Sequence, residues 1–444
     1  MGLQIIAVGG YSEIGRNCTL VRVDDEAIIL DMGLHMDNYI AYTEEREELH
    51  MEKDRSSDAL IKVEAVPNIY QIEDLWPKVK AICVTHAHLD HVGAVPFLSN
   101  KFRAGIHCTR YTAEVLRTIL KDEKISLRNK ITAHPENSKF RVSDKISVEF
   151  INITHSTPQT VVIAVHTPYG VVVYANDFKL DNAPTMGKRP NLRRFRQLGK
   201  KGVKALILDS LYADKPMKTP SESIAKEMLK DVMLGVNSKN KAVFVTTFSS
   251  HIARLKTLYE LGKKLRRKVV FIGRSLNKYI TAAERADIIS LSKKAVMVKY
   301  GSKVSRFFKK IKHPEKYLFI VTGHQGEPGA VLPRIVYENY YKFQEEDHVI
   351  FSCSVIPVEN NIINREKLDS ELKKRKIRLF TDVHVSGHAF REDHRDFLHM
   401  LKPEYIIPSH AEPENLEAMK ELALEIGYKP DKVKILKNGV QVSF

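Results

Sequence analysis

The chain shows two kinds of hydrophobic pattern, and the first dominates its opening part. Short β-branched runs bounded by turn residues predict strands. They are Leu3 to Val8, Thr19 to Val23, Ala27 to Leu30, Ala81 to Thr85, Ile106 to Thr109, Ile146 to Ile151, Val161 to Thr167 and Gly170 to Tyr174. Helical periodicity occurs at Pro96 to Lys101 and at Thr112 to Lys124. This part therefore predicts a β-rich, layered α/β structure.

A second pattern starts near Asp209, where strands and helices alternate strictly. The expected strands are Ala242 to Thr246, Val269 to Ile272, Tyr317 to Val321 and Val349 to Ser352, and the expected helices are Pro220 to Leu234, Ser250 to Leu265 and Asn277 to Leu291. Such alternation predicts a parallel sheet with helices on both faces. After Arg378 short strands return, with a histidine-rich loop and a last helix at Pro413 to Leu424. The chain thus divides into residues 1–208, an inserted α/β domain over 209–365, and residues 366–444.

Composition narrows the class of protein. No apolar run approaches the roughly 18 residues that a membrane span needs. Met1 to Val8 resembles a first strand and not a secretion signal, so a cytoplasmic protein without a membrane partner is expected. The four cysteines have no C-x-x-C spacing, which predicts buried thiols and neither disulfides nor a cysteine zinc site. They are Cys18, Cys83, Cys108 and Cys353.

The net charge favours a polyanionic partner. Seventy Lys and Arg against 54 Asp and Glu leave a formal charge of +16, and basic proteins attract nucleic acids through phosphate contacts. A solvated basic surface is the alternative. The cations are clustered: Lys188 to Lys204 holds eight and no anion, Lys293 to Lys316 holds nine against one Glu, and Arg365 to Arg378 is also mostly basic. RNA is therefore an expected partner.

The chemistry is concentrated in one short motif. Thr85 to His91, of sequence THAHLDH, places three histidines and one aspartate directly after an apolar strand. Core packing does not explain them, because such side chains are rarely buried without partners. Imidazoles and carboxylates suit zinc or a similar divalent ion, and a turn of this length can direct alternate side chains to two ions. The motif predicts a two-metal site.

This H-x-H-x-D-H motif resembles the signature of the metallo-β-lactamase superfamily, and the other motifs of that superfamily follow in order. Asp31 ends the strand Ile28 to Leu30, His155 opens the sequence HSTPQT, and Asp177 lies in ANDFK. Asn176 stands where many members have Gly. The resemblance predicts a metallo-β-lactamase αββα sandwich.

Three later motifs resemble those of the β-CASP nucleases. Asp209 lies in the sequence LDS, His388 in VSGHA and His410 in IPSHAE. Ser409 and Ala411 stand where Val and Gly are usual. The resemblance is strongest to the RNase J family in its shorter archaeal form. It implies that residues 209–365 are an inserted β-CASP domain, a parallel sheet flanked by helices, and that residues 1–208 and 366–444 form one metallo-β-lactamase domain.

The resemblance also assigns roles. It implies two zinc ions, with manganese able to substitute: His86, His88, His155 and Asp177 would bind one, and Asp90, His91, Asp177 and His410 the other. Asp31 would orient a ligand histidine and Asp209 would orient His410; capping of turns is the alternative for both. His388 is the candidate for binding the scissile phosphate or protonating the leaving oxygen, and His384 is a neighbour with a similar role.

Residues that could hold RNA phosphates lie in three segments. They are Ser386 and Gly387 beside His384; Gly323, Gln325 and Gly326 in a glycine-rich loop; and Ser249, Ser250 and His251 between a strand and a helix. An ordinary turn is the alternative for the second segment and helix capping for the third. The segment 34–76 has no counterpart in the family and is expected to be a solvated surface element.

The predicted function is a ribonuclease that releases mononucleotides from 5′ to 3′ and prefers single-stranded RNA with a 5′-monophosphate; a homodimer is a possible assembly. An RNA endonuclease similar to the 3′-end cleavage factors is the alternative, although their motif B has Ser-Ala-His where this chain has Ser-Gly-His. A DNA-processing β-CASP enzyme would lack the histidine of motif C. A thioester hydrolase or lactonase would not need the insertion, and an inactive RNA-binding subunit would have degenerate ligands.

Overall fold

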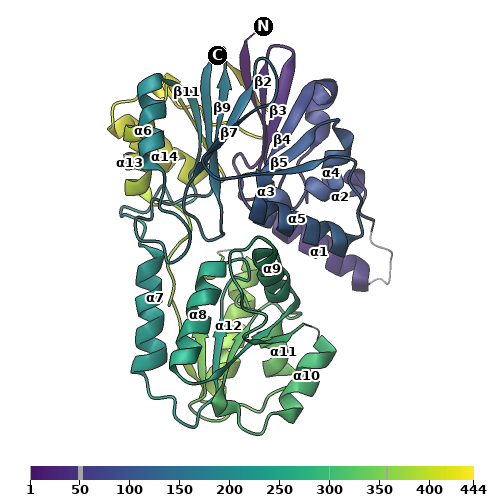
Figure 1. Ribbon diagram of the computed structural model, residues 1–444, viewed down its shortest axis with the longest axis vertical. Coiled ribbons are helices and arrows are strands. Elements are labelled where there is room, and N and C mark those ends of the chain that lie inside the picture. Colours follow the sequence, from purple (N-terminus) through teal and green to yellow (C-terminus); the bar gives the residue numbers. More distant parts are fainter. Residues whose placement is uncertain (1, 49–53, 300, 357–358) are drawn as a thin grey trace. The chain divides into compact units, whose positions relative to one another are not determined.

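Two mixed sheets packed face to face form the first unit of the computed structural model, which describes residues 2–48, 54–299, 301–356 and 359–444 (Figure 1). This unit comprises the chain up to Asn182 together with Gly187–Thr219 and Gly387–Phe444. One sheet has the order β19-β1-β2-β3-β4-β5-β6 and the other β18-β11-β10-β9-β8-β7. The strands are β1 (Leu3–Gly9), β2 (Cys18–Val23), β3 (Glu26–Leu30), β4 (Val79–Cys83), β5 (Gly105–Thr109), β6 (Ile131–His134), β7 (Ser138–Arg141), β8 (Ser147–Asn152), β9 (Val161–Thr167), β10 (Gly170–Ala175), β11 (Val203–Asp209), β18 (Tyr405–Ser409) and β19 (Gln441–Ser443).

Helices cover the outer faces of both sheets. Next to the first sheet lie α1 (Met36–Glu48), α2 (Ser57–Lys62), α4 (Val95–Leu98) and α5 (Arg110–Glu123), and next to the second lie α6 (Leu192–Lys201), α13 (Arg391–Leu401) and α14 (Pro413–Glu425). The inner core joins side chains of both sheets, such as Ile5 and Ile163, which are fully buried. These four layers confirm the predicted αββα sandwich.

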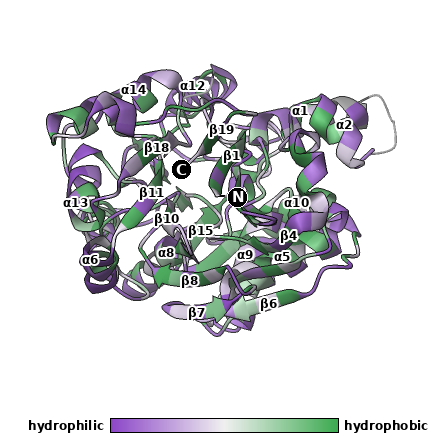
Figure 2. Cartoon of the chain, turned by 90° about the horizontal axis from the view of Figure 1, so that it is seen from above, coloured by the Kyte–Doolittle hydropathy of each residue, from purple (hydrophilic) through white to green (hydrophobic). Residues whose placement is uncertain are grey.

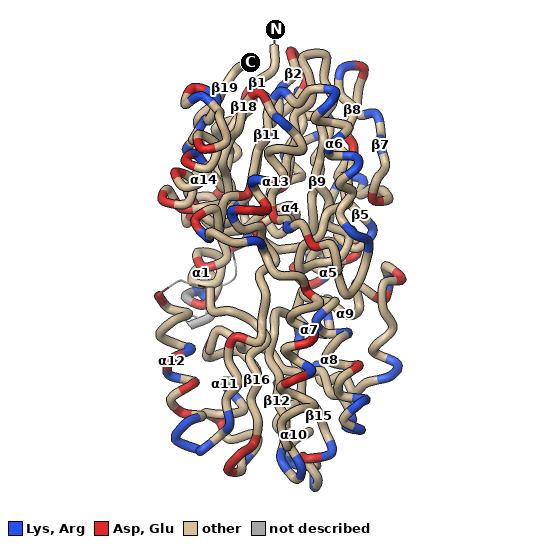
Figure 3. Tube along the Cα trace, turned by 90° about the vertical axis from the view of Figure 1, so that its left-hand side faces the viewer, with Lys and Arg blue, Asp and Glu red and all other residues tan. Residues whose placement is uncertain are grey.

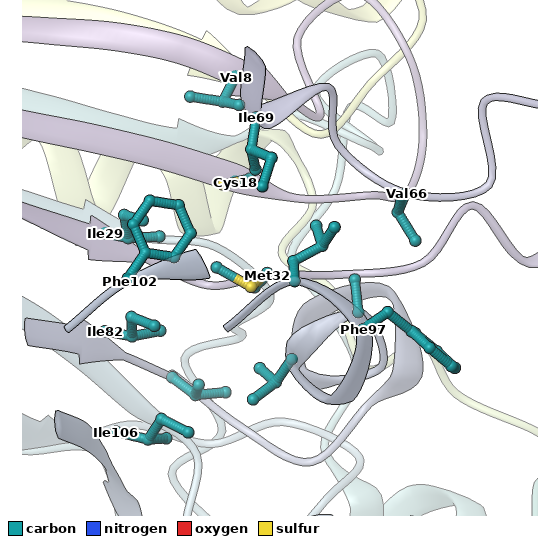
Figure 4. Close-up of a cluster of buried hydrophobic side chains, with 14 of the residues drawn as sticks. Val8, Cys18, Ile29, Met32, Val66, Ile69, Ile82, Phe97, Phe102 and Ile106 are labelled. Carbon is teal, nitrogen blue, oxygen red and sulfur yellow. The ribbon is translucent and has the colours of Figure 1, made fainter. Parts of the chain in front are cut away.

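The segment 34–76 is not the solvated surface element that the sequence predicts. Leu60, Ile72 and Leu75 are buried in the core against the first sheet, and so is Ile69, which Figure 4 shows with Val66 beside the strand residues. Ile69, Ile72 and Leu75 belong to a 3₁₀ segment, η1 (Ile69–Lys78). Its spacing of apolar residues follows three residues per turn, so neither helix nor strand periodicity reveals it. Residues 49–53 of the segment lie outside the described residues.

A six-stranded, all-parallel sheet forms the second unit, which comprises Ala183–Met186 and Pro220–Ser386. Its order is β14-β13-β15-β12-β16-β17. The strands are β12 (Val243–Thr246), β13 (Lys268–Ile272), β14 (Val296–Val298), β15 (Tyr317–Val321), β16 (His348–Phe351) and β17 (Arg378–Phe380), and the helices are α7 (Glu222–Lys230), α8 (Ile252–Lys264), α9 (Arg274–Arg285), α10 (Gly301–Lys310), α11 (Val331–Tyr337) and α12 (Glu359–Lys374). This is the parallel sheet flanked by helices that the alternating pattern predicts.

The boundaries between the two units along the sequence differ from the expected residues 209 and 365. Asp209 ends β11, which pairs with β10 and β18 and so belongs to the sandwich. At the other end, β17 pairs in parallel with β16, so the second unit continues beyond residue 365. Strand pairing, which hydrophobic periodicity does not reveal, therefore decides both divisions.

Two expectations from composition concern cysteines and membranes. All four cysteines are buried free thiols, as predicted. Within the part of the chain that the structure describes, no helix has the length and apolar character required to cross a membrane.

Candidate metal centre

The residues of the candidate metal centre lie in loops that follow strands of the first unit. The H-x-H-x-D-H motif follows β4, and its end forms one helical turn, α3 (Leu89–Val92). His155 follows β8, Asp177 follows β10 and His410 follows β18. Asp177 and His410 have φ angles of +50° and +53°, and Asp31 after β3 has +59°. Left-handed backbone at three residues with functional side chains is the type of strain that collects at functional sites.

Backbone contacts fix the H-x-H-x-D-H loop from both sides. The N–H of Asn17 donates to the carbonyl of Asp90 at 3.0 Å, and the N–H of Met32 donates to the carbonyl of His91 at 2.8 Å. A Cβ on Gly33 would lie 1.6 Å from the Asp90 oxygen, so only glycine permits this close approach of the two loops. The fold of the chain itself therefore holds the loop in place.

One group of possible ligands surrounds the Oδ2 atom of Asp177. His86 Nε2 and His155 Nε2 each lie 3.4 Å from this oxygen, and His88 Nδ1 lies 3.9 Å from it. His88 Nδ1 is also 3.0 Å from His155 Nε2. Three imidazole nitrogens and one carboxylate oxygen thus converge on one point, as the ligands of a zinc ion do.

A second group surrounds the other oxygen of Asp177. His91 Nε2 lies 3.1 Å and His410 Nε2 3.5 Å from Oδ1. Asp90 Oδ2 lies 3.5 Å from His91 Nε2 and 3.8 Å from His410 Nε2. The seven residues proposed as ligands therefore form two groups, and Asp177 presents one oxygen to each.

The protonation states of these groups fit a bound cation. Burial, aided by nearby His91, lowers the pKa of His86 to about 3, and burial also holds the pKa of His155 well below its ordinary value. Burial alone would raise the pKa of Asp177, but His91 and other histidines keep it well below the usual range. The buried atoms His86 Nε2 and Asp177 Oδ1 have no hydrogen-bond partner. Neutral imidazoles and an ionised carboxylate without partners are the donor set that a divalent ion requires.

Asp31 orients two of the histidines. Its carboxylate accepts from His91 Nδ1 at 2.7 Å, from the backbone N–H of Thr85 at 2.7 Å and from the Thr85 hydroxyl at 2.8 Å. The same hydroxyl lies 3.0 Å from His86 Nδ1. Burial would lower the pKa of His91, but Asp177, Asp90 and Asp31 raise it well above its ordinary value. Carboxylates that attract a proton so strongly to this position attract a metal ion in the same way.

Asp209 contacts His388 instead of His410, so the expected pairing is wrong. Its Oδ2 lies 2.9 Å from His388 Nδ1, and His388 Nε2 lies 3.8 Å from Asp177 Oδ2. Burial would lower the pKa of His388, but the carboxylates of Asp177 and Asp209 outweigh it and raise the pKa to about 9. The two carboxylates therefore favour the protonated form of His388, which lies at the edge of the first ligand group.

Gly387 positions a ligand through its backbone. Its carbonyl accepts from His155 Nδ1 at 2.8 Å, which leaves Nε2 of that ring directed at Asp177. A Cβ at Gly387 would lie 3.0 Å from Ser156 Oγ and 3.1 Å from His155 Cε1. The glycine of this motif thus permits the close approach that fixes His155.

Asn17 is a residue of the site that the sequence did not reveal. His410 Nδ1 lies 2.9 Å from Asn17 Nδ2 and 3.1 Å from Asn17 Oδ1, and this oxygen accepts from Asn176 Nδ2 at 3.1 Å. Asn176 Oδ1 in turn accepts from the Ser409 hydroxyl at 2.9 Å. All four residues are buried. Asn17 therefore contacts Nδ1 of His410, the role that the sequence analysis assigned to Asp209. Its position after a glycine-rich loop is the one sequence signal that could have indicated this role.

Replacing Asn17 with alanine is expected to weaken zinc binding by about 10- to 100-fold, the usual effect of removing a group that orients a ligand histidine. The reason is that His410 loses the amide that contacts its Nδ1 atom, so the ring can rotate. Competition with a fluorescent zinc chelator measures the affinity. Asn100→Ala, which removes a solvent-exposed amide bonded to the carbonyl of Ser126, is the matched control. Equal affinities in both variants would rule out the orienting role.

The glycine-rich loop after β15 is occupied by contacts of its own unit. Gly323 and Gly326 have φ angles of +104° and +81°, and a Cβ on Gly326 would lie 2.4 Å from the Asn364 carbonyl. Gln325 is buried, and its Oε1 accepts from the backbone N–H of Ile356 at 3.1 Å. The tight turn therefore explains the glycines of this loop without a ligand, and their predicted contact with phosphate stays a prediction.

The loop between β12 and α8 contains one residue that does not fit its predicted role. His251 is 4% exposed, and its Nε2 lies 3.3 Å from the Glu222 carboxylate. A facing carboxylate repels a phosphate, so this geometry argues against a phosphate contact. Ser250 is also buried, whereas Ser249 is partly exposed with its Oγ 2.8 Å from Ser275 Oγ. Of the three, Ser249 is the best placed to donate to a ligand.

His384 and Ser386 follow β17 at the end of the second unit. The ring of His384 lies 6.2 Å from that of Phe248, which is 4.3 Å from the ring of His324. His384 thus belongs to a group of rings from the loops after three strands, β12, β15 and β17. Loops after the carboxyl ends of parallel strands are the usual ligand-binding edge of such a sheet.

Comparison with known proteins places this geometry in a family. The chain is 41% identical to Ribonuclease J of Methanocaldococcus jannaschii, over 100% of this chain and 99% of that protein. The chain belongs to the Ribonuclease J family. Ribonuclease J of Pyrococcus abyssi is 40% identical over 98% of this chain and 96% of its own length, and Ribonuclease J of Thermus thermophilus is 32% identical over 98% and 73%.

Three family descriptions match successive parts of this Ribonuclease J family member. Residues 12–208 match the metallo-beta-lactamase superfamily, residues 240–368 the beta-CASP domain of Ribonuclease J, and residues 374–435 the Zn-dependent metallo-hydrolase RNA specificity domain. A crystal structure of a protein of unknown function from Enterococcus faecalis aligns over the whole of both chains with a TM-score of 0.68 at 18% identity. That likeness supports the fold alone.

Proposed function

We propose that this chain is a two-zinc ribonuclease that degrades single-stranded RNA from its 5′ end and releases mononucleotides. Membership of the Ribonuclease J family makes it a metal-dependent ribonuclease. The observation that carries the metal chemistry is the position of Asp177, whose two oxygens face two separate groups of ligands. His388 adds a proton donor beside them.

The two groups would hold two ions, with His86, His88 and His155 on one, Asp90, His91 and His410 on the other, and Asp177 on both. When bound, such ions polarise phosphoryl oxygens and activate water for attack. Zinc suits the histidine-rich donor set, and manganese is the alternative because carboxylates also suit it.

The residues of the chain have distinct tasks in the reaction. Asp31 and Asn17 keep His91 and His410 at fixed orientations, so that no ligand rearranges during hydrolysis. Asp209 accepts the Nδ1 proton of His388, so the other ring N–H, at Nε2, lies on the side of Asp177, 3.8 Å from its Oδ2. That N–H can bind the scissile phosphate or give its proton to the leaving 3′ oxygen. Water attack and proton donation then need only groups of the sandwich.

Purified protein is expected to carry two metal ions per chain. Elemental analysis after dialysis measures the content, and Asp177→Asn serves as the comparison, because a neutral amide cannot bridge two cations. A content of one ion in the unaltered protein, with full activity, would contradict the two-ion proposal.

The direction of degradation rests on the resemblance of Val385 to Ala389 to the corresponding motif of the family. A terminal monophosphate fits a group of N–H and hydroxyl donors, of which Ser249 is a candidate. A 5′-triphosphate brings more charge and bulk, and a 5′-hydroxyl leaves the donors without partners. The 5′-monophosphate should therefore be the preferred end.

RNAs of one sequence that differ only at the 5′ end test this proposal, together with a circular form. We expect the linear 5′-monophosphate to be degraded at least about tenfold faster than the others, because unpaired buried donors cost about 1 to 3 kcal/mol, and the circle to be resistant. Gel analysis of early products should show mononucleotides only. If the circle is cut as fast as the linear monophosphate, the protein is an endonuclease instead.

A further inference from the structure

A pocket of about 610 Å³ lies between α6 and α13, on the outer side of the second sheet of the sandwich. This volume is within the range of about 300 to 1,000 Å³ that small-molecule sites usually have. Leu180, Leu192 and Met400 form its apolar part, and Arg196, Lys200 and Lys402 supply positive charge. None of these residues belongs to the candidate metal centre.

Three of the four Lys and Arg residues that line the pocket have no acidic partner among the described residues. Arg196, Lys200 and Lys402 are exposed, and none of them forms an ion pair with an acidic residue in the described parts of the chain. The one acidic residue of the lining, Asp396, is already paired with Lys218 at 3.2 Å. Figure 3 shows Lys and Arg positions along α6, which contains no acidic residue. The pocket therefore has an excess of positive charge.

Helix stability does not explain all of these cations. Lys200 and Lys201 lie in the last turn of α6, where the helix dipole favours positive charge. Arg193 and Arg196 lie nearer the first turn, where the dipole disfavours it and no acidic residue is present. An anionic partner outside the chain would account for cations at these unfavourable positions.

The two helices are built to lie close together. A Cβ at Gly199 would lie 2.1 Å from the carbonyl oxygen of Met400, so this contact requires glycine. Of the lining residues, apolar Leu192 and Met400 are partly buried, whereas the cations are exposed; Figure 2 shows α6 as a mainly hydrophilic helix. An apolar base below a cationic rim suits a ligand with both flat apolar faces and phosphates.

The pocket is near the metal centre along the chain. Leu180 in its lining is three residues after Asp177, which limits their separation to about 11 Å. On the other side, α13 begins three residues after His388. The pocket lining and the candidate metal centre thus share two short stretches of chain, Asp177 to Leu180 and His388 to Arg391.

We propose that the pocket between α6 and α13 binds the sugar–phosphate backbone of the RNA substrate a few nucleotides from the cleaved bond. This inference rests on the proposed function, because it takes RNA as the substrate. Arg196 and Lys402 contact phosphates, and the apolar base accommodates a nucleobase. The contact retains the strand between successive cleavages. Single-stranded RNA fits better than an acidic protein segment because it repeats the combination of a phosphate and a flat base at each step.

The test is a charge reversal, Arg196→Glu with Lys402→Glu, in a His388→Ala background, in which hydrolysis during the measurement is expected to be at least about 100-fold slower. Fluorescence anisotropy gives the affinity for a single-stranded RNA of about 20 nucleotides, longer than common sites of about 4 to 16 nucleotides, at several salt concentrations. Lys121→Glu with Lys437→Glu, two exposed lysines outside the pocket, is the control with the same change of net charge.

We expect the pocket variant to bind at least about tenfold more weakly and its slope of log affinity against log salt to fall by about 1.4, since each phosphate contact to a single strand contributes about 0.7. The control should keep the slope of the background protein. An unchanged slope in the pocket variant, with normal hydrolysis of RNA by the unaltered protein, would overturn the pocket and leave the ribonuclease intact. If the unaltered protein does not hydrolyse RNA, the proposed function itself fails.

Discussion

Replacing Asp177 with alanine is expected to abolish RNA hydrolysis, with kcat reduced by at least about 10⁴-fold, which corresponds to about 5.5 kcal/mol of transition-state stabilisation. Each oxygen of this carboxylate faces one of the two ligand groups, so its removal opens both sites at once. Single-turnover kinetics on 5′-monophosphate RNA, together with metal content, measures the effect. The variant should contain fewer than two ions.

The fold should survive this substitution. The inserted unit has its own core, and backbone contacts hold the H-x-H-x-D-H loop. Circular dichroism and the thermal transition check this, and Asp144→Ala, which removes an exposed carboxylate, is the control. If the Asp177 variant keeps about a tenth or more of the normal kcat, Asp177 is not a carboxylate that bridges two ions.

Replacing His388 with alanine should lower kcat by about 10² to 10⁴-fold, the range typical of general acid–base residues. His388 belongs to neither of the two ligand groups proposed to hold the ions, so metal content should stay at two ions per chain. That combination, low kcat with full metal content, separates proton donation from metal binding. Loss of metal in parallel with activity would instead make His388 a ligand.

A substitution at Asp209 tests the proton donation by His388 without removing the histidine itself. Asp177 and Asp209 together raise the pKa of His388, and a general acid acts only while it is protonated. Activity should therefore fall as the pH rises through the pKa of His388. Asp209→Asn removes one of the two carboxylates, lowers that pKa and moves the alkaline limb of the pH–rate profile to lower pH. An unshifted limb would exclude this coupling.

The hydrophobic pattern predicts the β-rich first part and the inserted parallel sheet because both depend on local sequence, and the resemblance to the metallo-β-lactamase superfamily supplies the αββα arrangement. The sequence predicts less well which side chains of the site contact each other, because such contacts depend on the direction of side chains on neighbouring strands. Asp209 is in register with Ser409, the neighbour of His410, yet its carboxylate meets His388. Asn17 has no pattern that marks it, because a buried amide is recognisable only through its partners.

Charge also obscured elements of the fold. The run Lys188 to Lys204 was interpreted as a basic segment, although it contains α6, with Phe195 and Leu198 buried on one face. Five of the ten residues of α6 are cations, which gives the segment a basic composition although Leu192, Phe195 and Leu198 recur at helical spacing. By contrast, α12 has few apolar positions at helical spacing, and packing in the second unit decides its place.

The hydrogen bonds from Asn17 and Met32 to the H-x-H-x-D-H loop, and the close approach at Gly33, have a consequence for metal supply in the cell. A loop held by the backbone does not need an ion in order to fold, so little folding energy is coupled to the choice of ion. Affinity then follows the general order of divalent metals for nitrogen and oxygen donors, in which zinc exceeds manganese. If both zinc and manganese can bind, as proposed above, the ratio of their free concentrations decides which ion occupies the protein.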